Sequence, residues 1–321
     1  MRICVFGAGA IGGHLAGRLA KGEADVSVVA RGPQRDALAA KGLTVRAPDG
    51  EWHCTPRVGS PEELGPQDAV LITTKQTGLP GVARAIAPLL GPQTAVAFVM
   101  NGIPWWYFDG TPTPRRLPMV DPGDVVRDAI GVARTIGAVV WSACTVVEPG
   151  VVQVASQTSR LLLGEVDGRD SPRAQAIADA LKAGGMGAKV VPDIRTEVWT
   201  KLIGNLANGP LCLLSRRNIR ETFAEATVKQ AAITVLEESI AIAKALGIPM
   251  KIDAADRIAR SIDTPHKPSI LQDLEAGRPM EIDSLFRQPL ELGREMGVAA
   301  PMLELTVALA RQAAEAAGVY P

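Results

Sequence analysis

The first fourteen residues constrain the fold more than any other part of the chain. Residues 2–6 form a short apolar run that contains the β-branched Ile3 and Val5, and this pattern predicts a strand. The run breaks at GAGAIG, residues 7–12, and resumes from His14 with the spacing of a helix. A strand, a glycine turn and a helix in that order match the fingerprint of a dinucleotide-binding unit.

Each glycine of this turn has a predicted task. Gly7 permits the tight turn, Gly9 leaves the backbone open to a pyrophosphate, and Gly12 lets the helix pack on the strand. The helix N-terminus offers unpaired N–H groups and the positive end of its dipole to phosphates. We therefore predict that a dinucleotide binds at Gly7, Ala8, Gly9, Ala10, Ile11 and Gly12. The alternative is a glycine-rich turn without a ligand.

The end of the second predicted strand indicates which dinucleotide binds. This strand covers residues 24–30 and runs into Arg31, with no carboxylate before Asp36. NAD-specific units carry an acidic residue here for the ribose 2′-hydroxyl, whereas an arginine can hold a 2′-phosphate. We therefore predict NADP(H) rather than NAD(H). The alternative is that Arg31 is a solvated loop residue.

Two further strands are predicted at residues 68–74 and 94–100, and they end at Lys75 and Asn101. In an open α/β sheet, residues just past the carboxyl ends of the strands face the ligand. Gly7, Arg31, Lys75 and Asn101 all hold such positions, so we expect Lys75 and Asn101 to face the cofactor as well.

Composition narrows the class of protein. The 321 residues are enough for about two domains. Lys and Arg together number 34, as do Asp and Glu, so the zero net charge gives no support for a nucleic-acid or membrane partner. The four cysteines form no CxxC pair, which argues against a metal site and favours a reducing compartment. Cys4 and Cys144 lie in apolar strand-like runs, where we expect buried thiols.

No targeting segment is predicted. The apolar N-terminus is already explained by the fingerprint and has no basic region before it. Since no run approaches 18 apolar residues, we expect no transmembrane span and a cytoplasmic location.

The pattern of elements changes at Pro192-Asp193. Before it, strands alternate with helices, including a hairpin at residues 43–54 that turns at Pro48-Asp49-Gly50. After it, almost every segment has helical spacing, beginning with residues 194–206 and 222–246. The sequence predicts an α/β, Rossmann-type dinucleotide-binding domain over residues 1–192 and an all-helical substrate domain over residues 193–321.

The first predicted helix of the second domain carries a polar stripe. Lys201, Asn205 and Asn208 stand at i, i+4 and i+7, on one face of a mostly apolar helix. Burying these groups is costly unless they meet a polar ligand. The ammonium could protonate a carbonyl oxygen while a hydride reaches its carbon, and the carboxamides could orient the substrate. The alternative is a solvated surface face.

A second group of candidates lies at Ser269 and Glu281. Both side chains can hydrogen-bond a hydroxylated or carboxylated ligand. Ser269 could instead be a helix N-cap, and Glu281 could simply favour a helix N-terminus.

Together these motifs resemble the ketopantoate reductase (2-dehydropantoate 2-reductase) family over nearly the whole chain. The matching pieces, in order, are Gly7–Gly12, Arg31, Lys75, Asn101-Gly102, the Trp-x-Lys-Leu-x-x-Asn run of Trp199–Asn205, Ser269 with Leu271-Gln272-Asp273, and Glu281-Ile282-Asp283. The resemblance implies an NADP-dependent oxidoreductase of pantothenate biosynthesis that reduces a 2-oxo acid to a 2-hydroxy acid, here 2-dehydropantoate to pantoate. It also implies a helical half similar to the C-terminal domain of 6-phosphogluconate dehydrogenase.

The resemblance also implies roles for the candidate residues. Lys201 would be the proton donor, with Asn101, Asn205 and Ser269 near the substrate. Glu281 would stand by the nicotinamide ribose or the catalytic lysine.

Three features depart from the family pattern. The family carries a second asparagine where this chain has Gly209, and Asn208 lies one residue early, about 100° away on a helix. The family often has Asn-Gly soon after the Glu-Ile-Asp motif, and this chain reads Leu285-Phe286-Arg287 there. Residues 103–109 are rich in aromatics and could form a lid, pack under a loop or meet a second copy in a homodimer. A bulkier 2-oxo acid or an imine is therefore an alternative substrate, and a nucleotide-binding protein without turnover is a further alternative.

Overall fold

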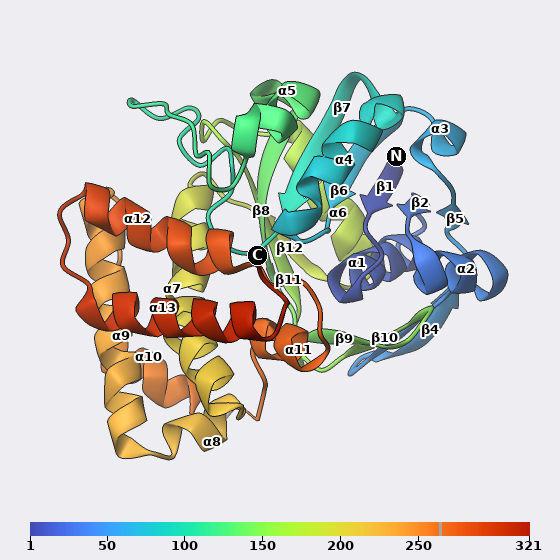
Figure 1. Ribbon diagram of the computed structural model, residues 1–321. Helices are drawn as coiled ribbons and strands as arrows, with labels where there is room; N and C mark the ends of the chain where they lie inside the picture. The colour runs from blue at the N-terminus through green and yellow to red at the C-terminus, as the bar shows by residue number, and fades with distance from the viewer. Residues whose placement is uncertain (263–264) are drawn as a thin grey trace. The chain divides into compact units, whose positions relative to one another are not determined.

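The computed structural model describes residues 1–262 and 265–321 (Figure 1). The chain divides into two compact units, and each is described by itself. The first comprises Met1–Met100 and Trp105–Ile194, and the second comprises Asn101–Pro104 and Arg195–Pro321. The domain boundary that the sequence predicts after residue 192 stays a prediction.

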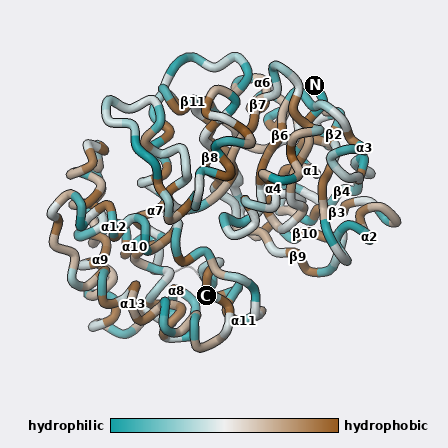
Figure 2. The backbone as a smooth tube through the Cα atoms, turned by 45° about the horizontal axis from the view of Figure 1, so that its top comes forward, coloured by the Kyte–Doolittle hydropathy of each residue, from teal (hydrophilic) through white to brown (hydrophobic). Residues whose placement is uncertain are grey.

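The first unit is built on an eight-stranded sheet in the order β12-β11-β8-β7-β6-β1-β2-β5. All neighbouring strands are parallel except β11 and β8. The strands β1, β6, β7 and β8 are buried over most of their length, and Figure 2 colours much of this inner sheet as apolar. The bounds are Arg2–Phe6 (β1), Asp25–Val29 (β2), Arg57–Val58 (β5), Gln67–Ile72 (β6), Leu90–Val99 (β7), Thr135–Trp141 (β8), Arg160–Glu165 (β11) and Gly187–Val190 (β12).

Helices cover this sheet, as the alternating pattern predicts. Ser171 caps α6 by accepting a hydrogen bond from the Ala174 N–H group. The helices are α1 (Ala10–Lys21), α2 (Gly32–Lys41), α3 (Pro61–Leu64), α4 (Leu79–Ala85), α5 (Val125–Ile130) and α6 (Pro172–Ala183), with short 3₁₀ turns at Gln76–Gly78, Ala87–Leu89, Pro122–Asp124 and Val132–Arg134.

A second sheet of four strands packs on α1. Its order is β4 (Gly50–Cys54), β3 (Leu43–Ala47), β10 (Val151–Val154) and β9 (Cys144–Glu148). The predicted hairpin is confirmed as the antiparallel pair β3–β4. A Cβ on Gly13 would lie 2.7 Å from Val152 Cγ2, and one on Gly17 would lie 2.4 Å from Val45 Cγ2. These two glycines therefore let the helix approach the second sheet closely.

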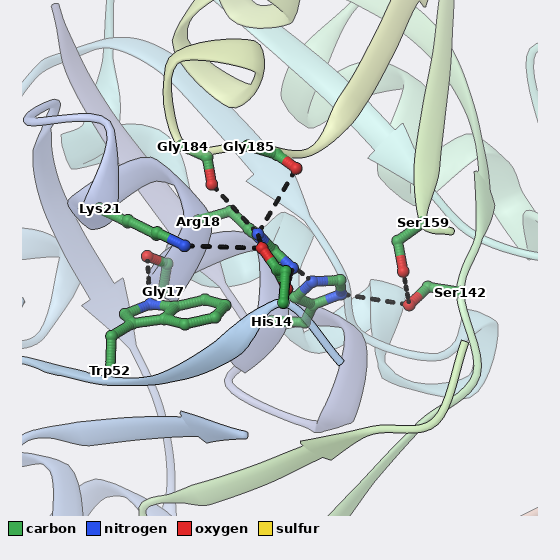
Figure 3. A network of polar contacts seen from close by, with 10 residues as sticks. His14, Gly17, Arg18, Lys21, Trp52, Ser142, Ser159, Gly184 and Gly185 are labelled. Atoms are coloured by element: carbon green, nitrogen blue, oxygen red, sulfur yellow. Dashed lines mark hydrogen bonds and ion pairs between the residues drawn. The ribbon is translucent and has the colours of Figure 1, made fainter. Parts of the chain in front are cut away.

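A partly buried polar network fixes α1 to the turn of the β3–β4 hairpin (Figure 3). The Arg18 guanidinium donates to both carboxylate oxygens of Asp49, at 2.6 and 2.7 Å, and to His14 Nε2 at 3.1 Å. His14 Nδ1 lies 3.1 Å from the hydroxyl of Ser142. Burial, reinforced by the Arg18 charge, lowers the pKa of His14 to about 4, so the imidazole is neutral at pH 7. The hydrogen bond from Arg18 lowers the pKa of Asp49.

The aromatic residues after β7 belong to the core of the first unit. Trp105 and Trp106 are 2% and 1% exposed, and Trp105 meets Phe98 edge-on with ring centroids 5.5 Å apart. A Cβ on Gly137 would lie 2.5 Å from the Trp106 ring, so β8 is shaped around that ring. The interpretation of these rings as a substrate lid is wrong, because they fill space under the loop.

The four cysteines are free thiols. Cys4 is buried, as predicted, and burial raises the pKa of its thiol to about 11. The predicted burial of Cys144 is wrong, since this residue is half-buried. The reason is that β9 is an edge strand of the smaller sheet.

The second unit is helical, as predicted, but several helices differ from the expected ranges. The first continues from Ile194 to Ser215 and includes Pro210. The segment expected as one helix from residue 222 is two helices, because Asn218 and Glu225 each cap a new start by accepting a backbone N–H. The helices are α7 (Ile194–Ser215), α8 (Ile219–Phe223), α9 (Ala226–Ala245), α10 (Ala254–Ser261), α11 (Ser269–Glu275), the π-helical turn η5 (Asp283–Arg287), α12 (Gln288–Glu295) and α13 (Pro301–Ala316). Within the described ranges, none of these or the other helices is long and apolar enough to cross a membrane.

Candidate nucleotide pocket and active-site residues

The predicted ligand-facing positions follow four strands that are neighbours in the sheet. The order β7-β6-β1-β2 is parallel throughout, so the carboxyl ends of these strands share one edge. Gly7 follows β1, Arg31 follows β2 and Lys75 follows β6. Asn101 follows β7, but its contacts assign it to the second unit.

A pocket of about 320 Å³ lies at this edge, within the first unit. It contains the glycine turn and the residue predicted to select the cofactor. The lining residues are Phe6, Gly7, Ala8, Gly9, Val29, Ala30, Arg31, Gln34, Thr74, Gly78 and Val146.

The geometry of the glycine turn separates the tasks of its three glycines. Gly7 has φ +109°, and a Cβ there would lie 2.8 Å from Thr74 Cγ2. A Cβ on Gly12 would lie 1.8 Å from the Gly7 carbonyl oxygen, so only glycine fits where α1 passes β1. A Cβ on Gly9, in contrast, would have no described atom within 4 Å. Gly12 is thus required by packing and Gly9 by nothing in the fold, which fits a ligand close to the backbone at Gly9.

The polar side chains of the pocket suit an anionic group. Arg31 is exposed, and its Nη2 lies 3.1 Å from where a Cβ on Gly81 would stand, so α4 leaves room for the guanidinium. No acidic residue occurs among the lining residues given above. These residues fit a dinucleotide that carries a phosphate beside Arg31.

Sequence reasoning missed Gln34 and Thr74. Gln34 Nε2 and Thr74 Oγ1 are buried and have no hydrogen-bond partner among the described residues, and both side chains line the pocket. Buried polar groups in this state are typical of positions where a ligand supplies the partner. Thr74 directly precedes Lys75, so its place at a strand end was a signal in the sequence. Gln34 had no such signal beyond its nearness to Arg31.

In the second unit, the polar stripe lies on one uninterrupted helix, α7, as predicted. Lys201, Asn205 and Asn208 are all half-buried, so the lysine is less covered than the apolar pattern predicts. Asn208 Oδ1 is buried without a partner in the part of the chain that the structure describes.

Two of the three departures from the family pattern, Gly209 and Phe286, meet in space. A Cβ on Gly209 would lie 2.8 Å from Phe286 Cζ, and the Phe286 ring is fully buried. The ring therefore occupies the space that a side chain at position 209 would need. Asn208 stays on the face of Lys201 and Asn205, while position 209 belongs to the core.

The segment around Asn101 is attached to the π-helical turn η5. The Ile103 N–H group donates to the Ser284 carbonyl at 2.8 Å, and a Cβ on Gly102 would lie 2.4 Å from the same oxygen. Asn101 Oδ1 and Ser284 Oγ are buried and lack hydrogen-bond partners within residues 1–262 and 265–321. Glu281, which is buried, comes just before this turn. π-Helical turns of this kind are frequent at functional sites.

Ser269 is exposed and is the first residue of α11. Its interpretation as an N-cap is wrong, because Pro268 holds that position and no side chain caps the helix. Its predicted place near the substrate stays a prediction.

Known proteins of one family match nearly the whole chain. The family model "Ketopantoate reductase PanE/ApbA" matches residues 3–168, and the model of the C-terminal part of the same family matches residues 193–314. A 2-dehydropantoate 2-reductase of Mesorhizobium japonicum is 41% identical over 327 residues and covers 100% of both chains. The enzyme of the same name from Caulobacter vibrioides is 31% identical and covers 97% of this chain and 99% of its own.

Solved structures show the same fold. The crystal structure of 2-dehydropantoate 2-reductase from Geobacter metallireducens has a TM-score of 0.86 and 28% identity, and the match covers 98% of this chain and 100% of that one. A solved structure from Ralstonia solanacearum reaches a TM-score of 0.93 at 35% identity and covers 99% of both chains.

Proposed function

The chain belongs to the ketopantoate reductase family, and on that premise we propose that it reduces 2-dehydropantoate to pantoate with NADPH. The observation that carries this proposal is the 41% identity to a 2-dehydropantoate 2-reductase across the full length of both chains. The pocket at the glycine turn supports it independently, since its side chains suit a phosphorylated dinucleotide.

We assign the cofactor to the residues that follow the strand ends. The pyrophosphate binds at the N-terminus of α1, to Gly7, Ala8, Gly9, Ala10, Ile11 and Gly12. Arg31 binds the 2′-phosphate. Lys75, Asn101 and Glu281 complete the cofactor site. Bound NADPH supplies the hydride that reduces the carbonyl carbon. The protein's own residues bind and orient the reactants and deliver the proton.

Lys201 is the proposed proton donor. Its ammonium group protonates the carbonyl oxygen of the substrate, and general acid catalysis of this kind contributes roughly 10²–10⁴-fold in rate. Asn205 and Asn208, on the same face of α7, orient the substrate and the lysine. Asn101 and Ser269 bind the substrate, and Glu281 holds the catalytic lysine or the nicotinamide ribose.

A second candidate is a reductase of a different 2-oxo acid or of an imine. The observation in its favour is that the Phe286 ring fills the space beside Gly209, the position where the family carries an asparagine. The aromatic segment no longer supports this candidate, because Trp105 and Trp106 lie in the core.

A panel of 2-oxo acids tests both candidates. The purified protein is assayed for NADPH oxidation with 2-dehydropantoate and with bulkier 2-oxo acids, each in parallel with NADH. The highest kcat/KM is expected for 2-dehydropantoate with NADPH. A higher value for another acid would favour the second candidate, and NADPH binding without turnover of any acid would indicate a nucleotide-binding protein.

The proton donor is tested by Lys201→Met. We expect kcat to fall by about 10²-fold or more while the affinity for NADPH is retained. The matched control is Lys244→Met, which removes an exposed lysine from α9 in the same unit and should leave kcat unchanged. An unchanged kcat in Lys201→Met would refute the assignment.

A cytoplasmic location and a homodimer complete the proposal. The four free thiols support a reducing compartment. Gel filtration with light scattering would test the dimer.

A further inference from the structure

The small four-stranded sheet contributes to the nucleotide pocket. Val146 of β9 lines the pocket, although β9 belongs to the sheet that packs on α1 rather than to the large sheet. The turn between β9 and β10 lies beside α2, since a Cβ on Gly150 would stand 3.5 Å from Ala37 Cβ. One wall of the pocket is therefore built by a part of the fold that the dinucleotide fingerprint does not include.

This turn holds the side chain of Gln34. The Gly150 N–H group donates to Gln34 Oε1 at 3.0 Å. Gly150 is itself fixed, because its carbonyl accepts a hydrogen bond from the Thr44 N–H group of β3 at 2.9 Å. Gly150 has φ +85°, a conformation that favours glycine, so the position of its N–H depends on this residue type.

The hydrogen bond to Gly150 sets the orientation of the Gln34 amide. Because the oxygen accepts from the backbone, the nitrogen with its two N–H donors is the end that remains. That nitrogen is buried and has no partner among the residues the structure describes, and Gln34 lines the pocket together with Arg31. Leaving a buried donor unpaired is unfavourable, so a ligand that brings an acceptor is expected here.

Arg31 and the nitrogen end of the Gln34 amide both offer hydrogen-bond donors. A guanidinium has five N–H donors and no acceptor, and the Gln34 amide adds two more. A ribose 2′-hydroxyl needs an acceptor for its hydrogen, whereas a phosphate brings only acceptors and negative charge. The side chains of Arg31 and Gln34 together therefore match a phosphate better than a hydroxyl.

We propose that Gln34 is a specificity-determining residue of the nucleotide site, which donates to the 2′-phosphate of NADPH beside Arg31 and is positioned by the Gly150 N–H group. This inference rests on the proposed NADPH-dependent function. It adds a second phosphate-binding residue and a positioning turn that lies 116 residues along the chain from Gln34.

The test is a comparison of NADPH and NADH binding in two variants of the full-length protein. In Gln34→Glu, one carboxylate oxygen still accepts from Gly150, but the other now repels a phosphate. The dissociation constant for NADPH should rise by about tenfold or more, while that for NADH changes by less than about threefold. In Gln34→Leu, NADPH binding should weaken by a few-fold and NADH binding should not change.

Gln153→Glu is the matched control, because it makes the same change of charge at an exposed position of β10. It should leave both dissociation constants at their wild-type values. Thermal unfolding of each variant without nucleotide separates binding from folding. Gln34→Glu keeps an acceptor for the Gly150 N–H group and should unfold at the wild-type temperature, whereas Gln34→Leu removes that acceptor and should unfold at a lower temperature.

The results that would overturn the proposal are specific. An equal loss of NADPH and NADH affinity in Gln34→Glu would mean that Gln34 acts on the fold or on the shared part of the nucleotide. Unchanged NADPH binding in both Gln34 variants would remove Gln34 from the site, and a wild-type preference for NADH would overturn the phosphate assignment. If the wild-type protein binds NADPH selectively and loses that selectivity in Gln34→Glu, but does not reduce 2-dehydropantoate, the proposed reaction fails and the role of Gln34 stands.

Discussion

Two alanine substitutions in the glycine turn separate nucleotide binding from folding. Gly9 has φ −68° and ψ −166°, which alanine adopts without strain, and its Cβ would meet no described atom within 4 Å. Gly12 is three residues away, and its Cβ would lie 1.8 Å from the Gly7 carbonyl oxygen. The same added methyl group is therefore harmless to the fold at one position and impossible at the other.

The expected magnitudes follow from these contacts. A Gly→Ala change in a permitted conformation stabilises a protein by about 0.4–1 kcal/mol through the unfolded state, so Gly9→Ala should keep or slightly raise the unfolding temperature. The methyl group would occupy space next to the pyrophosphate, and overpacking of this kind costs about 1–3 kcal/mol, or roughly 5- to 150-fold in Kd for NADPH. Gly12→Ala must move the backbone of α1 or β1, so we expect a loss of stability at or above about 3 kcal/mol.

The assay combines thermal unfolding without nucleotide and titration with NADPH. Gly9→Ala should unfold like the wild-type protein but bind NADPH weakly, and Gly12→Ala should unfold at a lower temperature. Wild-type affinity for NADPH in Gly9→Ala would refute the placement of the pyrophosphate at this turn. Equal destabilisation by both substitutions would refute the separation of their roles.

Two further predictions concern the packing of each unit. His14 has a pKa of about 4 in the folded protein and about 6.5 when unfolded, so the unfolded state binds more protons between these values and stability falls as the pH drops from 6.5 to 4, by up to about 3 kcal/mol. In urea unfolding, the stability of His14→Gln should fall by about 3 kcal/mol less than that of the wild-type protein over this range, and identical curves for the two proteins would contradict the assignment. Gly209→Asn should destabilise the protein by about 1–3 kcal/mol because its Cβ would meet the Phe286 ring, and it should cost less when introduced into Phe286→Ala than into the wild-type chain; an equal cost in both backgrounds would mean that the ring is not the obstacle.

Much of this architecture follows from local patterns. Short apolar runs that stop at polar or glycine residues predict several elements. These are the strand and turn of residues 2–12, the hairpin at residues 43–54 and the strand ends before Arg31 and Lys75. The stripe of α7 is visible because the period of a helix places Lys201 and Asn205 on one face. These features need only neighbouring residues, and the sequence contains them in full.

What the sequence did not reveal depends on contacts between distant segments. The pairing of β3 with β10 joins residues more than a hundred positions apart, and no sequence pattern in either strand predicts its partner. The aromatic residues at 105–108 are compatible with a lid, a loop or a core, and only the room left by Gly137 decides that Trp106 is buried. Burial of the ring at position 286 likewise depends on the absent side chain at Gly209.

The glycines of α1 show how a motif that is easy to recognise can hide a second task. The fingerprint explains Gly7, Gly9 and Gly12, but the helix also needs Gly13 and Gly17, because side chains there would run into Val152 and Val45 of the small sheet. That sheet in turn presents the Gly150 N–H group to Gln34, and Gln34 lines the same pocket as Gly9. The helix that offers its N-terminus to the pyrophosphate thus also supports, through its glycine face, the wall that holds Gln34 beside Arg31. Substitutions at Gly13 or Gly17 would therefore act on nucleotide selectivity through the position of the small sheet, although neither glycine lines the pocket.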